Sequence, residues 1–318
     1  MGKRKICKIV FVILSIFLCV AFYELFGICI AYKKQPEVSN TIKKETQNDS
    51  WNERSENMER AVIIEKNPEA LLQRVRLIRN AKEDIILSTF AFQSDESGKL
   101  ILGALHDAAD RGVHIRLLVD GMESWIDMEG NPYFYGLSSH ENVEIKLYNK
   151  ANPLKPWKMM GRMHDKYLIA DGKRYILGGR NTYNYFLGDF PGHKNYDRDV
   201  LVVCDEPEKE NSVNQLSEYF ETIWNQEDSG YFHNNKKLAN RKSVKNAVLE
   251  LQNGYQKYFE ENKERICDTD YTDETFETEK IALVSNPIHT GSKEPVVWYQ
   301  LGELMKNAKN RVKIHTPY

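Results

Sequence analysis

The sequence predicts an α/β fold in which helices flank a mixed β-sheet, preceded by an N-terminal transmembrane helix. Two observations carry this prediction. Short apolar strands alternate with amphipathic helical segments after residue 59, and residues 9–32 are apolar except for Glu24. Alternation of this kind is typical of sheets with helices packed on their faces. The composition, with 41% hydrophobic and 28% charged residues, excludes a disordered or collagen-like chain.

The apolar run from Ile9 to Tyr32 is 24 residues long, enough to cross a hydrocarbon core of about 30 Å. It lacks the small-residue cleavage site of a signal peptide, and Cys29 follows Ile28 where a lipoprotein site has a small residue. We therefore expect an uncleaved anchor over residues 1–34. Four basic residues precede the run and two follow it closely, which favours a single-pass protein of the cell membrane with a cytoplasmic N-terminus. The polar residues 35–58 are expected to form a tether.

The remaining elements follow from apolar spacing and from turn residues. Pro68 begins a helix, Gly112 ends another, and Asp171-Gly172 predicts a hairpin turn. A polar helical pattern fills 235–264, and the acidic segment 268–280 is expected to be a solvated connection. The predicted strands lie at 85–90, 113–119, 143–147, 162–170, 174–178 and 200–203, and the further helices at 96–111 and from Pro207 to about Trp224.

One internal repeat predicts a second copy of the same unit. The segment 80–89 (NAKEDIILST) recurs as 307–316 (NAKNRVKIHT), at an offset of 227 residues, although a common helix–strand phrase could also match by chance. If the repeat is real, the second copy begins near residue 295, and the chain ends inside its first strand. We therefore expect a fragment with one complete half at 59–234, a connection at 235–294 and a truncated second half at 295–318.

The strongest chemical feature is the pattern H-x-K-x4-D-x6-G-G-x-N, which runs from His164 to Asn181. His164 and Lys166 are two residues apart on a predicted strand, so both side chains lie on one face, where unpaired burial would be costly. An ammonium group that neutralises phosphate oxygens beside an imidazole that attacks or moves a proton suits a phosphodiester. Gly178-Gly179 allows close backbone approach to a ligand. A surface hairpin with incidental polar residues is the alternative.

This pattern resembles the signature of the phospholipase D superfamily, and the runs around Gly179-Arg180 and at 197–200 are similar to its bacterial cardiolipin synthase-like branch. The resemblance implies a phospholipase D-like half-domain, a phosphohistidine intermediate and no metal or cofactor. Two such motifs face each other in family members; one histidine attacks phosphorus and the other protonates the leaving alcohol. It implies these roles: nucleophile, His164; phosphate binding, Lys166, Gly178, Gly179 and Asn181; orientation of the imidazole, Asp197, with Asp199 as the alternative; turn hydrogen bonding within the catalytic motif, Asp171.

The sequence departs from the family because it holds one motif. At the repeat offset the second histidine would fall near position 391, beyond the chain, so we expect this fragment alone to have little or no activity and its missing second half to be its partner. His106, His114 and His140 are expected to be structural or solvated, and His193 to be a loop histidine that could also reach the site. The side chains before His164 could dip into a lipid interface or pack under their loop: Trp157, Met159 and Met160.

Charge separates the possible functions. Residues 1–34 hold six basic residues and one acid, which leaves 38 basic and 45 acidic residues, a net charge of −7, in residues 35–318. Nucleic-acid binding calls for a basic surface, so we expect no nucleic-acid partner and disfavour a nuclease. The leading hypothesis is a membrane-anchored phosphatidyltransferase acting on a phosphatidylglycerol-like phospholipid. The alternatives are the nuclease and a truncated, inactive remnant. The five cysteines show no spacing typical of a zinc site.

Overall fold

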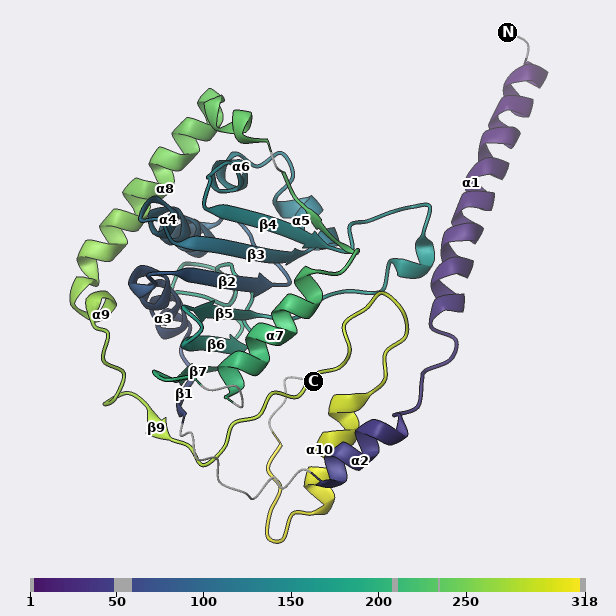
Figure 1. The fold of residues 1–318 in the computed structure, drawn as a ribbon. Coiled ribbons are helices and arrows are strands. Elements are labelled where there is room, and N and C mark those ends of the chain that lie inside the picture. Colours follow the sequence, from purple (N-terminus) through teal and green to yellow (C-terminus); the bar gives the residue numbers. More distant parts are fainter. Residues whose placement is uncertain (1–2, 49–58, 208–210, 234, 315–318) are drawn as a thin grey trace. The chain divides into compact units, whose positions relative to one another are not determined.

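A computed structural model describes residues 3–48, 59–207, 211–233 and 235–314 (Figure 1). The chain divides into two compact units, each considered by itself. The sheet unit comprises Asn52–Lys150 and Met163–Leu283, and the anchor unit comprises Met1–Trp51, Ala151–Arg162 and Val284–Tyr318. The apolar faces of strands and helices must be covered, and the two units achieve this with different elements.

The sheet unit is built on a mixed sheet with the strand order β8-β4-β3-β2-β5-β6-β7-β1-β9. Strands β2, β3 and β4 are parallel, whereas the pairs β2–β5, β5–β6, β6–β7, β1–β7, β1–β9 and β4–β8 are antiparallel. This confirms the predicted fold class. The strands are β1 Arg60–Ile64, β2 Asp84–Thr89, β3 His114–Asp120, β4 Val143–Tyr148, β5 Tyr167–Ala170, β6 Arg174–Gly178, β7 Asp199–Val203, β8 Ser229–Tyr231 and β9 Phe276–Glu277.

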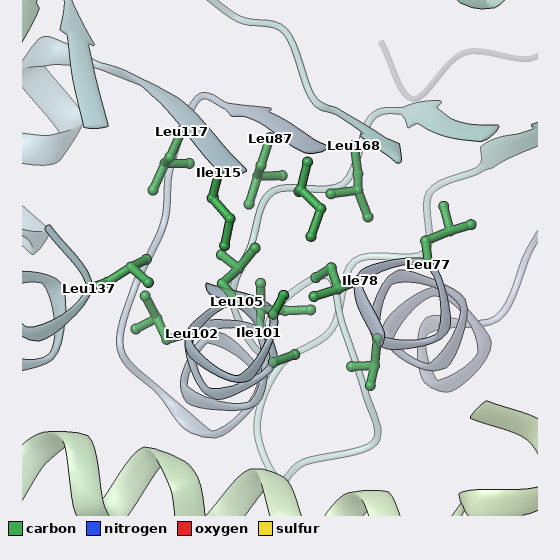
Figure 2. Close-up of a cluster of buried hydrophobic side chains, with 14 of the residues drawn as sticks. Leu77, Ile78, Leu87, Ile101, Leu102, Leu105, Ile115, Leu117, Leu137 and Leu168 are labelled. Carbon is green, nitrogen blue, oxygen red and sulfur yellow. The ribbon is translucent and has the colours of Figure 1, made fainter. Parts of the chain in front are cut away.

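Helices cover both faces of this sheet, which is why its central strands are apolar on both sides. On one face α3 (Asn67–Asn80) and α4 (Glu96–Asp110) pack on the strands, and the outer helix α8 (Lys242–Glu261) packs on α4 and on α6 (Pro132–Ser138). Figure 2 shows the resulting core, with leucine and isoleucine side chains of α3 and α4 meeting those of the strands. The shorter helices of this unit are α5 (Gly121–Asp127), η2 (Lys236–Asn240) and α9 (Lys263–Cys267).

The opposite face is covered by α7 (Ser212–Trp224), which crosses several strands. Tyr219 of α7 lies beside Tyr167 of β5, and Ser212 hydrogen-bonds Tyr175 of β6. The guanidinium of Arg116 on β3 lies over the ring of Phe220. This helix therefore holds the strands that lead to and from the hairpin at Asp171-Gly172.

The acidic segment 268–280 is not the solvated connection that its composition predicts. It wraps the buried guanidinium of Arg76, which donates hydrogen bonds to the carbonyl oxygens of Asp268 and Asp270 and pairs with Glu274. Tyr271 is buried under the same guanidinium, and β9 pairs with β1. The sheet unit thus continues to residue 283, past the expected boundary at 234, because a buried arginine needs these acceptors.

The anchor unit contains α1 (Lys3–Ala31), of which Arg4–Ala31 is long and apolar enough, by length and composition, to cross a membrane. The expected tether is partly helical, since Asn40–Asn48 forms α2, and its residues 49–58 lie outside the described part of the chain. A helix, α10 (Val296–Lys306), precedes the second copy of the repeat as expected. Residues 311–314 do not form the predicted strand, and 315–318 are outside the described residues.

Candidate active site

The segment that carries His164 and Lys166 precedes β5 rather than belonging to it. The predicted strand 162–170 is regular only from Tyr167 onward. The segment is held by Met163, whose side chain is buried and whose amide donates a hydrogen bond of 3.1 Å to the buried carboxylate of Asp120, at the end of β3. The two motif residues are therefore fixed at the end of the central strands by a backbone contact.

Lys166 is a buried cation. Its side chain is 5% exposed, its Nζ donates a hydrogen bond of 2.6 Å to the carbonyl oxygen of His164, and it lies 5.4 Å from the ring centroid of Phe90. Burial lowers the pKa of Lys166 to about 8, although the charges of Asp165 and Asp197 act in the opposite direction. An ammonium held this way, with few water contacts, is prepared to bind a phosphate oxygen.

His164 keeps an exposed side chain, and its ring meets the ring of Phe90 edge to face at a centroid distance of 4.6 Å. Partial burial, followed by the positive charge of Lys166, lowers the pKa of His164 below its usual 6.5. The imidazole is therefore neutral at pH 7, the state that a nucleophile needs. Phe90 thus contacts the side chains of both His164 and Lys166. The sequence did not indicate these contacts, because Phe90 falls in a predicted apolar strand.

Asn181 contacts the segment that follows β2 and begins at Phe90. Its side chain is buried, its Oδ1 accepts a hydrogen bond of 3.2 Å from the amide of Ala91, and it also hydrogen-bonds Tyr183. With the oxygen engaged by a backbone amide, the NH₂ group is the donor end of this side chain.

The glycine pair makes room for two carboxylates. A Cβ at Gly178 would lie 2.0 Å from Oδ1 of Asp199, and a Cβ at Gly179 would lie 2.0 Å from Oδ2 of Asp197. Both glycines are needed because a side chain would occupy the space of these oxygens. Both glycines therefore have a packing role, and the phosphate-binding role expected for Gly178 and Gly179 stays a prediction.

The two carboxylates have different surroundings, which separates the alternatives that spacing left open. Asp199 is fully buried and pairs with Arg74 at 2.9 Å and with Arg180 at 3.3 Å. Asp197 is partly exposed, accepts the amide of Arg198 at 2.7 Å and acts on the pKa of Lys166. Asp199 is therefore committed to the arginines. Among the described residues Asp197 forms no hydrogen bond to His164, so the orienting role expected of it is not made in this structure.

The part of the chain that carries these residues is similar to a known family. Residues 74–224 match the family model described as "Cardiolipin synthase, PLD-like domain". The chain carries a phospholipase D-like domain. The resemblance that the spacing from His164 to Asn181 indicated is thereby confirmed.

Individual relatives match parts of this chain. An uncharacterized protein of Helicobacter pylori is 30% identical over 212 residues, 62% of this chain and 39% of that protein. Cardiolipin synthase C of Escherichia coli is 30% identical over 154 residues, 44% of this chain and 31% of that enzyme. The aligned stretch thus spans less than two fifths of either relative. The solved structure of NucT from Helicobacter pylori covers 55% of this chain and 99% of NucT, with 19% identity and a TM-score of 0.43.

The motif aspartate of the phospholipase D-like domain lies away from His164, at the other end of β5. The carboxylate of Asp171 accepts hydrogen bonds from the amides of Lys82, Glu83 and Asp84, at 2.8–3.1 Å. Asp171 and Gly172 both have positive φ, as a tight hairpin turn of this type requires. Asp171 therefore makes turn contacts here and is not brought to the reacting groups, and its place among the catalytic residues stays a prediction.

Replacing Asp171 by Ala is expected to lower the free energy of unfolding by about 1–3 kcal/mol, because amides of the α3–β2 connection lose their acceptor. Asp171→Asn keeps one acceptor oxygen and should lose less. Urea titrations of the full chain in detergent, followed by circular dichroism, check the order. Equal stability of the Ala variant and the unmodified protein would contradict this role.

The other histidines considered in the sequence lie outside the segment from His164 to Asn181. His106 and His140 both contact the carboxylate of Asp110, and His114 pairs with Glu144. His193 is exposed in its loop and lies against the ring of Tyr185. Among the residues that the structure describes, no three His, Cys, Asp or Glu side chains form a group that could hold a metal ion.

Proposed function

We propose that this chain supplies the membrane anchor and one catalytic half of a phosphatidyltransferase of the cardiolipin synthase type. The observation that carries the proposal is the buried ammonium of Lys166 next to a neutral, accessible imidazole at His164. The pair combines charge stabilisation for a phosphodiester with a nucleophile. Asn181, with its oxygen engaged by Ala91, adds a donor for the same phosphate.

The proposed reaction has two steps. A nitrogen of His164 attacks the phosphorus of a phosphatidylglycerol-like lipid; the N–P bond forms as the P–O bond to glycerol breaks, and the departing oxygen takes a proton. A hydroxyl group of a second lipid then attacks phosphorus; the P–O bond forms as the N–P bond breaks and releases the imidazole, and the hydroxyl proton passes to the group that gave up a proton in the first step. The proton donor for the first step would be the histidine of a second such motif, in addition to the one at His164. Asp197 would orient the imidazole once that second motif completes the site.

Lipid is favoured over nucleic acid as the substrate by two features of the chain. The net charge of −7 over residues 35–318 repels a polyanion, and α1 has the length and apolar character to hold the site at a bilayer. We propose a single membrane span with a cytoplasmic N-terminus, which leaves the phospholipase D-like domain on the outer side.

An activated substrate tests the chemistry without the second motif. In phosphatidyl-p-nitrophenol the leaving group departs as a stable anion and needs no proton donor. The full chain in detergent micelles is expected to release p-nitrophenolate in a burst of one equivalent and to retain labelled phosphate on His164. A thymidine p-nitrophenyl phosphodiester, as the nucleic-acid counterpart, should give no burst.

Matched variants decide the outcome. His164→Ala should abolish the burst, whereas His193→Ala, which changes an exposed loop histidine, should leave it intact. A burst that survives in His164→Ala would refute the nucleophile. Cleavage of the thymidine diester or of plasmid DNA without lipid turnover would replace the lipid proposal by the nuclease.

The burst rate at low substrate concentration is expected to depend on pH through two groups. Because the pKa of His164 is lowered from its usual 6.5, the imidazole becomes protonated only at a pH below that of an ordinary histidine. The rate should therefore fall only in that more acidic range. Above pH 8 Lys166 loses its proton, so the rate should decline as pH rises through about 8. In Lys166→Arg the charge persists at high pH. A decline at pH 8 that is unchanged in this variant would assign it to another group.

A further inference from the structure

The loop before the catalytic motif, residues 151–162, is a defined structure rather than an irregular connection. Several of its backbone amides donate hydrogen bonds to the carbonyl oxygen three residues earlier: Lys155 to Asn152, Lys158 to Lys155, Met159 to Pro156 and Gly161 to Lys158. Its centre is the 3₁₀ helix η1 (Pro156–Lys158). In such a helix side chains three residues apart lie above one another.

Three large apolar side chains of this loop are exposed to solvent. Leu154, Trp157 and Met160 are each three residues apart, and their exposed fractions are 76%, 43% and 58%. Lys155 and Lys158 repeat the same spacing one position along. Exposed aromatic and aliphatic groups beside lysines are typical of segments that lie in a membrane interface, where the rings enter the boundary and the ammonium groups meet anionic headgroups.

The same loop packs against the apolar helix within the anchor unit. Tyr23 of α1 donates a hydrogen bond of 2.9 Å to the carbonyl oxygen of Leu154. A Cβ at Gly27 would lie 2.5 Å from Cγ of Pro156, so helix and loop are in direct contact at that glycine. Gly27 is four residues and Tyr23 eight residues before the helix end at Ala31, which corresponds to roughly 6 and 12 Å along the axis.

We propose that loop 151–162 is a second membrane contact, in which Leu154, Trp157 and Met160 insert into the headgroup region of the bilayer that α1 crosses. The proposal rests on the membrane anchor of the proposed function and deepens it. The contact at Gly27, about one turn before the end of the helix, places the loop near the interface, which extends several ångströms beyond the hydrocarbon core. His164 lies four positions after Met160, and four extended residues reach at most about 14 Å.

The full chain in liposomes of phosphatidylcholine and phosphatidylglycerol tests the insertion. Part of the phosphatidylcholine carries bromine atoms at carbons 6 and 7, which quench tryptophan emission at shallow depth. The emission of Trp157 is obtained as the difference between the unmodified protein and Trp157→Phe. At least half of it is expected to be lost on bromination. Trp224, which is 6% exposed in the sheet unit, is the control, and its emission should fall by less than a tenth.

A second variant separates loop insertion from anchoring. Gly27→Val displaces Pro156, and we expect at least a twofold decrease in the quenching of Trp157 while the protein stays resistant to alkaline extraction from the liposomes. Unquenched Trp157 emission in the unmodified protein would overturn the proposal, and blue-shifted, unquenched emission would identify a protein partner instead. The measurement needs no catalysis, so a missing p-nitrophenolate burst with intact quenching would refute the proposed chemistry alone.

Discussion

Replacing Asp199 by Asn is expected to lower the free energy of unfolding by about 3–5 kcal/mol, a large share of the roughly 5–15 kcal/mol that stabilises an ordinary domain. The change is nearly isosteric, but it removes the negative charge between Arg74 and Arg180. Both arginines and the carboxylate are almost entirely buried. Two guanidinium groups would then remain in the interior without a counter-charge.

The effect should be large because the two ion pairs of Asp199 link distant parts of the sheet unit. Arg74 belongs to α3 and Asp199 begins β7. Arg180 also donates hydrogen bonds to the carbonyl oxygens of Ile64, the last residue of β1, and of Glu65. Urea titration followed by circular dichroism measures the loss. Asp197→Asn, a partly exposed carboxylate two residues away, is the control and should change stability by less than about 1 kcal/mol. Equal losses for both variants would contradict this account.

Replacing Lys166 by Met is expected to have opposite effects on chemistry and on stability. Removal of the buried ammonium should slow the p-nitrophenolate burst by about 10²–10³-fold, as for other groups that stabilise charge in a transition state. The same change should raise the free energy of unfolding at pH 7 by about 1–3 kcal/mol, because a folded-state pKa of about 8 means that burial disfavours the charged form.

The sign of this stability change depends on pH. The pKa of Lys166 is lower in the folded than in the unfolded chain, so the cost of burying its charge is fully present below pH 8 and disappears as pH rises toward 10.5. The gain from Lys166→Met should follow the same course. Lys173→Met, at an exposed position after the hairpin turn, should change neither rate nor stability. A destabilised Lys166→Met variant would show that the ammonium supports the fold.

Local patterns predicted most of the elements because their causes are local. The hairpin at Asp171-Gly172 needs two residues that tolerate positive φ, and both are found there. The helices α3 and α4 follow from apolar spacing, together with Pro68 at the start of the first and Gly112 after the second. The strand β1 and the paired segment 276–277 were missed, because their stability comes from neighbours in the sheet rather than from their own sequence.

The sequence by itself determined which chemical groups are present: the spacing from His164 to Asn181 identified the family, and residues 9–32 the apolar helix. Only the tertiary structure decided what those groups do. It buried Asp199 between two arginines, placed Asp171 at the opposite end of β5, and brought Phe90 against His164 and Lys166. Spacing fixes which residues can share a face, but burial and charge partners come from elements far apart in the chain. Those partners set the pKa of an imidazole or an ammonium group and decide whether a carboxylate remains available.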